Sequence, residues 1–521
     1  MPAAENGESM NVLNISSLGR QDIACVAILL VVSSLLYYVA WLGFAGSDDA
    51  YYAAAAQNWL NDFPYVGDNH WSLRHPLVLP LAASFAVFGL SEFALFVPII
   101  IYNFLVVLLG YFILRNRFSG LTSTLLSVIL VSTPLFAASG GVCFIDIAEL
   151  LFVALSLTFF AEAVSRDFQV QPLVIAGAFA GLAFSSRETA AALIVFYGLC
   201  FLLGYGGHRL KYFVMAGGFL IVFAIEALYY LVMTGNPLHR LNISLHHDEI
   251  TRSEEAQKII DGSGSISTDT VFDTLLLVLL NQEFGILYYV FFIAVFWVFL
   301  SRNIAGVERI VLRVLSGSAL TWLLCLALAG GILFLLPRYT FPSTFAAALV
   351  VAIVIGSLWQ ARRHLLAAGL GIAIVAVNLL CISVENRAIF HGERQLVALA
   401  GESNETIHTD GLTLHRIRFL LQVEGLDNVS DLTEPADGAL WYRVPRNINQ
   451  TIRDGGEIPL GERLRTDPGY SFETVAIYDP GRRWLGPLIE AIGLRDALPT
   501  RIYAKIDRPN QSSTLYRIRR K

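Results

Sequence analysis

Apolar residues occur along most of this chain in stretches of about 20, which is the length a helix needs to cross the hydrocarbon core of a bilayer. Short polar breaks separate the stretches. In chain order the eleven candidate spans are 23–45, 94–114, 121–138, 147–165, 172–186, 188–205, 212–233, 274–300, 311–334, 340–359 and 365–384. The pattern predicts a polytopic α-helical membrane protein whose membrane domain covers residues 23–385.

The basic residues predict how these spans are oriented. They occur at alternate breaks: Arg20, Arg115, Arg117, Arg166, His208, Arg209, Lys211, Arg302, Arg309, Arg313, Arg362 and Arg363. Because basic loops stay in the cytoplasm, residues 1–22 are expected inside and the chain after residue 385 outside. This orientation requires that 75–90 does not cross, and this stretch is short and contains Pro76 and Pro80.

Two long outer loops follow from this topology. The first, 46–93, is expected to form two helices lying on the membrane surface. The second, 234–273, contains His246, His247 and a Gly/Ser-rich piece. Adjacent histidines do not easily chelate one metal ion, so we interpret this loop as a solvated segment that can close over a bound substrate.

The pattern changes after residue 385. Strand-like pieces (439–444, 474–478, 502–506, 514–518) alternate with helical ones (389–400, 413–422, 485–492). This alternation predicts a small extracytoplasmic α/β domain over residues 386–521. The domain has no dinucleotide fingerprint or metal motif, so we expect it to shape access of an acceptor rather than perform chemistry.

Composition agrees with the membrane assignment. The chain is 55% hydrophobic and 15% charged, with a mean hydropathy of +0.60, which excludes a soluble globular protein. The five cysteines lie in or beside apolar stretches without metal-like spacing and are expected to be buried thiols. We expect membrane lipids as partners and no nucleic acid.

Two adjacent carboxylates, Asp48 and Asp49, follow the first apolar stretch. Charges at a membrane boundary are costly and mark functional positions. One of the two can act as a general base. The alternative is a helix cap, because an acid at the start of the Ala-rich stretch that follows would accept backbone N–H bonds. Both interpretations remain open for each carboxylate.

Further acids and arginines fall at the same predicted outer end. They are Asp146 and Glu149, the neighbours Arg187 and Glu188, and Arg338 with Tyr339. Each has a structural alternative: Asp146 can cap a helix, Arg187 and Glu188 can form a local ion pair, and Arg338 can snorkel to the interface. Their convergence on one face is what a site for an anionic, lipid-linked substrate requires.

These motifs resemble the GT-C glycosyltransferases, in particular the bacterial aminoarabinose or galacturonic acid lipid A transferases and the protein O-mannosyltransferases. The resemblance covers about residues 24–345. The matching segments are Asp48-Asp49 before Tyr51-Tyr52, Arg74-His75-Pro76-Leu77, Phe88 to Glu92, Ser132-Thr133-Pro134 before Asp146, Gly177 to Arg187, and Arg338-Tyr339 before Phe341-Pro342.

The resemblance implies an inverting transfer of a sugar from a polyprenyl-phosphate donor to lipid A, an envelope glycan or a protein. The reaction would occur at the periplasmic face of the inner membrane. It also implies site roles: Asp48 and Asp49 are expected to be catalytic, and Tyr52, His75, Asp146, Arg187, Glu188, Arg338 and Tyr339 to bind substrate. A divalent Mg²⁺ or Mn²⁺ is possible, although two carboxylates are too few ligands to assign one.

Two other classes of protein place charges in membrane domains. A transporter or flippase puts ionisable residues near mid-span and often shows internal repeats, whereas here only Glu226 interrupts the centre of a span and no repeat is visible. A polysaccharide polymerase or ligase would share an outer site but lack the acidic pair after the first span. The transferase is therefore preferred.

Overall fold

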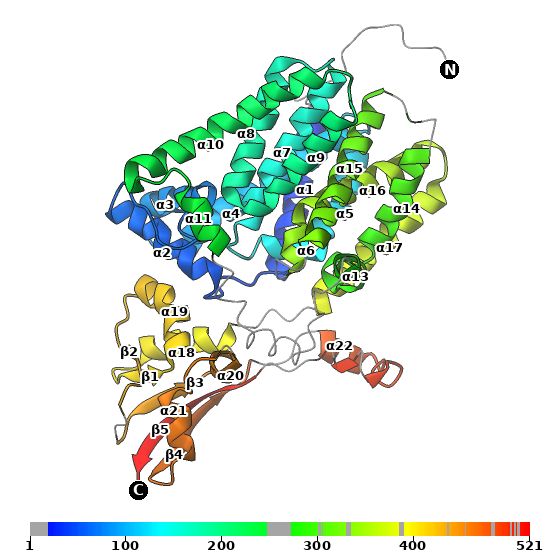
Figure 1. Ribbon diagram of the computed structural model, residues 1–521. Helices are drawn as coiled ribbons and strands as arrows, with labels where there is room; N and C mark the ends of the chain where they lie inside the picture. The colour runs from blue at the N-terminus through cyan, green and yellow to red at the C-terminus, as the bar shows by residue number, and fades with distance from the viewer. Residues whose placement is uncertain are drawn as a thin grey trace.

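The protein is described from a computed structural model, shown in Figure 1, in which a bundle of helices lies beside a smaller domain with a sheet. The structure describes residues 19–246, 272–300, 304, 306–329, 335–384, 390–434, 437–453, 455–480, 485–500, 503–504, 507 and 511–521. Most of the second predicted outer loop, including His247, lies outside the described residues.

Within the described part of the chain, seven helices are long and apolar enough to cross a membrane. They contain α1 (Arg20–Val39), α4 (Glu92–Arg115), α7 (Asp146–Ser165), α10 (Tyr212–Thr234, preceded by η3, Arg209–Lys211), α15 (Gly306–Leu328), α16 (Phe341–Gln360, preceded by η6, Pro337–Thr340) and α17 (His364–Val384). Each corresponds to one of the predicted spans, which confirms a polytopic helical membrane protein.

The other four predicted spans form shorter or interrupted helices, so the count of eleven is not confirmed. They correspond to α5 (Gly120–Ser132) with α6 (Pro134–Ser139), α8 (Val170–Ser186), η2 (Glu188–Ala190) with α9 (Ala191–Leu202), and α13 (Phe272–Leu280) with η5 (Gln282–Phe284) and α14 (Leu287–Leu300). The residue before a proline is disfavoured in the helical conformation, and Thr133, which precedes Pro134, has a non-helical ψ of 125° between α5 and α6.

The basic breaks between helices make pairwise contacts. Arg115 at the end of α4 forms an ion pair with Asp22 at the start of α1, at 2.5 Å. Arg117 forms another with Glu308 at the start of α15, at 2.6 Å. These two pairs bring the beginning of α1, the end of α4 and the beginning of α15 to one end of the bundle, as the predicted topology requires.

The first predicted outer loop forms the expected two helices, α2 (Asp48–Asn61) and α3 (His75–Phe88). In Figure 1 they lie at the end of the bundle that faces the smaller domain, beside α11 (His239–His246). Tyr52, Ala56 and Trp59 are buried in the protein. These side chains of α2 therefore pack against the protein.

The C-terminal domain contains a five-stranded sheet in the order β2-β1-β3-β5-β4. The strands are β1 (Ile407–Thr409), β2 (Val429–Asp431), β3 (Leu440–Arg443), β4 (Tyr470–Tyr478) and β5 (Ser513–Arg520). Strand β1 is parallel to β2 and β3, whereas β5 is antiparallel to β3 and β4. The helices are α18 (His391–Glu402), α19 (Gly411–Glu424), α20 (Pro445–Arg453), α21 (Leu460–Thr466) and α22 (Leu485–Ala491).

Three of the four predicted strands and all three predicted helices have counterparts in this domain. The strand expected at 502–506 falls mostly outside the described residues, and its two described residues, 503 and 504, are helical. Strands β1 and β2 were not predicted. Each has only three residues, which is too short for an alternating apolar pattern to be visible.

The domain docks on the first outer loop. Helix α19 contacts α2. The Phe44 ring packs against Phe419 of α19, with ring centroids 4.9 Å apart, and edge-on against Phe390 at 5.7 Å. Arg394 of α18 forms an ion pair with Glu92 at 2.5 Å. These contacts position the C-terminal domain directly beside the turn that carries Asp48 and Asp49.

Candidate functional site

Asp48 lies at the start of α2 and forms an ion pair with Arg338 of η6, with Arg338 Nη1 2.8 Å from Asp48 Oδ2. The two side chains are 15% and 25% exposed respectively. The Arg338 guanidinium also lies over the Phe144 ring, 4.8 Å from its centroid. Arg338 Nε is buried and has no hydrogen-bond partner among the described residues. The pair is thus partly open to solvent and keeps one unused donor.

Asp49 has a different environment. Its side chain is fully buried and accepts hydrogen bonds from the backbone N–H groups of Ala45 at 2.6 Å, Ser47 at 2.6 Å and Ala50 at 3.0 Å. Burial, reinforced by the charge of Asp48, raises the pKa of Asp49 to about 6, although the three N–H bonds oppose this shift. Asp49 therefore stabilises the turn before α2.

A second ion pair joins Asp146 at the start of α7 to Arg187, which follows α8. Both side chains are buried. The Arg187 guanidinium stacks over the Tyr339 ring, 4.0 Å from its centroid. Arg338 interacts electrostatically with both Asp146 and Arg187. The two ion pairs are therefore neighbours, and the adjacent residues Arg338 and Tyr339 connect them.

Tyr52 lies one turn after Asp48 on α2 and is fully buried. Its hydroxyl accepts a hydrogen bond from Arg74 Nη1 at 2.6 Å. Burial raises the pKa of Tyr52, and the charges of Asp48 and Asp146 act in the same direction. Tyr52 thus belongs to the same cluster of side chains as both ion pairs. Arg74 joins this cluster through its hydrogen bond to Tyr52.

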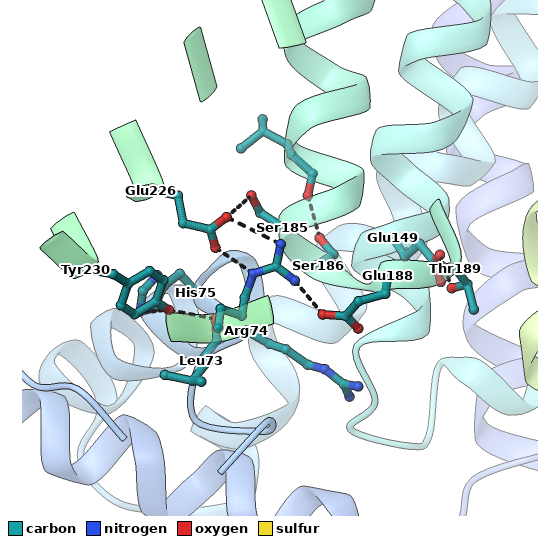
Figure 2. A network of polar contacts seen from close by, with 12 residues as sticks. Leu73, Arg74, His75, Glu149, Ser185, Ser186, Glu188, Thr189, Glu226 and Tyr230 are labelled. Carbon is teal, nitrogen blue, oxygen red and sulfur yellow. Dashed lines mark hydrogen bonds and ion pairs between the residues drawn. The ribbon is translucent and has the colours of Figure 1, made fainter. Parts of the chain in front are cut away.

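Glu188 belongs to a neighbouring polar network, shown in Figure 2. Arg240 of α11 pairs with Glu188 at 2.5 Å and with Glu226 of α10 at 2.9 Å. Figure 2 labels Glu226, Glu188 and Ser185 in this network, and Ser185 donates a hydrogen bond to Glu226 at 3.1 Å. This contact explains Glu226, the one acid near the centre of a predicted span, because Arg240 neutralises it.

His75 lies at the edge of this network rather than beside Asp48. Its ring stacks on Tyr230, with centroids 5.6 Å apart, and packs edge-on against Trp59 at 5.5 Å. Burial and the charge of Arg240 lower the pKa of His75 to about 4, so the imidazole is neutral near pH 7. Arg74 connects the two clusters, because it bonds Tyr52 and interacts electrostatically with Arg187 and Glu188.

The structure therefore brings together, in two adjoining clusters, all nine residues that the sequence analysis expected to be catalytic or to bind substrate. Asp48, Tyr52, Asp146, Arg187, Arg338 and Tyr339 form the first, with Asp49 buried beneath it, and His75 and Glu188 belong to the second. Sequence reasoning did not assign Arg74 and Arg240 to the site. Arg74 is an arginine within a largely apolar helix start, a signal that could have identified it.

The carboxylates do not fit a divalent metal in this arrangement. Asp48 is paired with Arg338 and Asp49 with three backbone N–H groups. Among the described residues, no group of three or more His, Cys, Asp or Glu side chains could hold a metal ion. The Mg²⁺ or Mn²⁺ considered from the sequence remains a prediction, and no chemical step is derived through it.

Comparison with known proteins gives a family match over part of the chain and a similarity of fold. Residues 74–236 match the family described as dolichyl-phosphate-mannose-protein mannosyltransferase. No curated protein sequence matches the chain significantly. The structure is similar to the crystal structure of ArnT from Cupriavidus metallidurans in the apo state, with a TM-score of 0.52 and 13% identity, covering 89% of this chain and 97% of ArnT.

Two further solved structures are similar. One is the same ArnT bound to undecaprenyl phosphate, with a TM-score of 0.50 and 13% identity, covering 88% of this chain and 96% of that chain. The other is the Archaeoglobus fulgidus oligosaccharyltransferase in complex with Zn and sulfate, with a TM-score of 0.51 and 14% identity, covering 78% of this chain and 62% of that chain. The resemblance to GT-C glycosyltransferases drawn from the sequence is confirmed, and the fold is similar to that of ArnT.

Proposed function

We propose that this protein is an inverting glycosyltransferase that moves a sugar from a polyprenyl-phosphate donor to an acceptor at the outer face of the membrane. The family match over residues 74–236 and the ArnT-like fold support a glycosyltransferase. The undecaprenyl phosphate bound to ArnT supports a lipid phosphate as the carrier. The acceptor is lipid A, an envelope glycan or a protein.

The observation that carries the proposal is the Asp48–Arg338 pair. A carboxylate that serves as general base needs access to solvent and substrate, and Asp48 is partly exposed whereas Asp49 is fully buried. A phosphate site needs a cation with free donors, and Arg338 keeps Nε without a partner among the described residues. A guanidinium suits phosphate because its planar donors can bind two oxygens. The two roles thus fall on one ion pair.

The reaction then proceeds with these groups. The donor phosphate takes a place at the Arg338 guanidinium, which loosens the hold of Arg338 on Asp48. The acceptor hydroxyl attacks C1 of the sugar from the face opposite the phosphate, and Asp48 accepts its proton. The C1–O bond to the phosphate breaks with the electron pair going to oxygen, so that polyprenyl phosphate leaves as an anion with Arg338 beside it.

The second ion pair supports this arrangement. Arg187 is held between Asp146 and the Tyr339 ring, which fixes a buried positive charge behind Arg338. Fixed charges placed before the reaction stabilise a developing anion without reorganising during it. Arg187 and Asp146 therefore act by positioning Tyr339 and Arg338 and by adding to the positive field at the leaving group.

The test is a transfer assay on purified protein in proteoliposomes with radiolabelled undecaprenyl-phosphate sugars and extracted lipid A, envelope glycan and protein acceptors. We expect stoichiometric release of undecaprenyl phosphate and labelled acceptor, and loss of about 10²-fold or more in kcat for Asp48→Asn. Movement of intact donor across the bilayer without release of the lipid phosphate would instead identify a flippase. Full activity of Asp48→Asn with a native thermal midpoint would remove Asp48 from the mechanism.

A further inference from the structure

The C-terminal domain contains a pocket of about 570 Å³ that no site residue described above lines. Its walls come from three places in the chain. Asp410 and Gly411 directly follow β1, Asp431 ends β2, and Gln450 belongs to α20, the helix after β3. Residues 456–460 complete the rim. The pocket therefore lies at the carboxyl ends of the parallel strands.

The strand order explains why a pocket lies at the carboxyl ends of these strands. The chain runs from β1 through α19 to β2 on one side, and then crosses to β3 on the other side of β1. Such a reversal leaves a crevice outside the carboxyl ends of the strands, and open α/β sheets bind their ligands there. The sheet of this domain thus has a binding crevice where its topology predicts one.

The lining determines which ligand chemistry fits. It carries the carboxylates of Asp431 and Glu457 and the guanidinium of Arg463. A third carboxylate, Asp410, caps α19 by accepting hydrogen bonds from Thr413. The negative balance disfavours phosphates and uronic acids, since like charges repel. Carboxylates accept hydrogen bonds from hydroxyl and amino groups. Apolar side chains, among them Ile458, offer a surface for the carbon face of a ring.

Contacts connect this pocket to the turn that carries Asp48. Gln450 Oε1 accepts a hydrogen bond from Arg416 Nη2 at 2.7 Å. Arg416 in turn packs against Gly46, which has φ of +60°, and a Cβ added at Gly46 would lie only 2.7 Å from the Arg416 backbone oxygen. A side chain at Gly46 would clash there, so the close approach requires glycine. Two contacts therefore separate the pocket from the Asp48 turn.

We propose that the pocket binds a pyranose unit with free hydroxyl or amino groups, which forms part of the acceptor. The bound unit holds the acceptor on the C-terminal domain while its reacting hydroxyl reaches Asp48. The role as an acceptor subsite rests on the proposed glycosyltransferase function, whereas the binding itself does not.

Binding is tested with the full-length Asp48→Asn protein in nanodiscs, so that no transfer occurs. The probe is a glucosamine disaccharide, measured by saturation-transfer NMR and titration calorimetry, with a glucuronic acid disaccharide as the charge-reversed probe. We expect the first probe to bind and the second not to bind. Adding Asp431→Ala should weaken binding about tenfold or more, because a charged hydrogen-bond acceptor is lost.

Asp427→Ala is the matched control, since Asp427 is an exposed acid just before β2, whereas Asp431 ends that strand in the pocket. It should leave binding unchanged. Thr433→Trp, which fills the pocket, should abolish binding even if Asp431→Ala perturbs folding. Equal binding by all these variants, or no binding of the glucosamine disaccharide by protein with a native thermal midpoint, would overturn the proposal.

The transfer assay separates this inference from the proposed function. If the disaccharide binds but the wild-type protein transfers no sugar from any donor, the function fails and the pocket stands. If transfer occurs and Asp431→Ala and Thr433→Trp leave KM for the glycan acceptor unchanged, the acceptor subsite fails and the function stands. A rise in KM of about tenfold with kcat retained supports both.

Discussion

Arg338 Nη1 lies 2.8 Å from Asp48 Oδ2, which joins two residues 290 positions apart in the chain. One begins α2 in the first outer loop and the other belongs to η6, before α16. The pair combines a carboxylate that can take a proton with a guanidinium that can hold a phosphate. The Asp49 carboxylate, in contrast, accepts hydrogen bonds from three backbone N–H groups of its own turn.

Arg338 variants should separate charge from geometry. Arg338→Met is expected to lower kcat about 10²- to 10³-fold, because a preorganised charge at the leaving group is lost. Arg338→Lys keeps the charge but not the planar donor pair, so its kcat should fall less while KM for the donor rises. Steady-state kinetics with the lipid-phosphate sugar measure both. Equal kcat in wild type and Arg338→Met would exclude Arg338 from phosphate binding.

Asp49 should produce a pH dependence of stability. Its folded pKa of about 6 exceeds the ordinary value of 3.8, so the folded state binds the proton more tightly than the unfolded state. The associated stability is complete below about pH 4 and is lost as the pH rises through about 6. A shift of about two units corresponds to about 3 kcal/mol.

Thermal midpoints of the detergent-solubilised protein between pH 4 and 7 test this assignment. Asp49→Asn should remove the corresponding slope, whereas Asp48→Asn should keep most of it. An unchanged slope in Asp49→Asn would show that another group is responsible.

Removing one partner of the buried Asp146–Arg187 ion pair should lower the stability of the folded protein. Arg187→Gln leaves the Asp146 carboxylate buried without its cation, and we expect destabilisation of about 3–5 kcal/mol. The double variant Asp146→Asn with Arg187→Gln removes both charges and should recover much of that stability while transfer remains impaired. Thermal unfolding and the transfer assay give the two readouts. Normal transfer by the stable double variant would make the pair purely structural.

Arg240 is expected to hold α11 against η2 and α10 through its two ion pairs. Arg240→Met leaves Glu188 and Glu226 without their shared cation. The double variant Arg240→Met with Glu226→Leu should be more stable than the sum of the single changes predicts, by about 0.5–3 kcal/mol in a double-mutant cycle. Strictly additive thermal stabilities would contradict this role of Arg240.

The orientation in the membrane can be tested with two exposed positions. His208 lies between α9 and η3, in a predicted cytoplasmic break, and Asp427 lies in the C-terminal domain. In intact cells, Asp427→Cys should react with an impermeant thiol reagent, whereas His208→Cys should react only after permeabilisation. Wild-type protein, whose Cys25, Cys143 and Cys200 are buried, sets the background. The reverse labelling would invert the predicted topology.

Much of the membrane domain was predictable because each span carries its own signal. An apolar stretch of sufficient length forms a helix wherever it inserts, since backbone groups must bond within the segment in lipid. The prediction was weaker where a stretch contains an internal break, as between α5 and α6 at Pro134. It was also weaker for β1 and β2, whose three residues are too few to show a period.

The sequence alone determined the class of protein, the end at which the acids and arginines gather, and the set of candidate site residues, because hydropathy and charge act locally along the chain. It did not establish which of Asp48 and Asp49 is the base. The tertiary structure gives them different environments, because Asp48 pairs with Arg338, 290 positions away in the chain, whereas the three backbone N–H bonds to Asp49 are local. The Arg240 bridge to Glu188 and Glu226 and the pocket beside β1 likewise arise where separate elements of the chain converge.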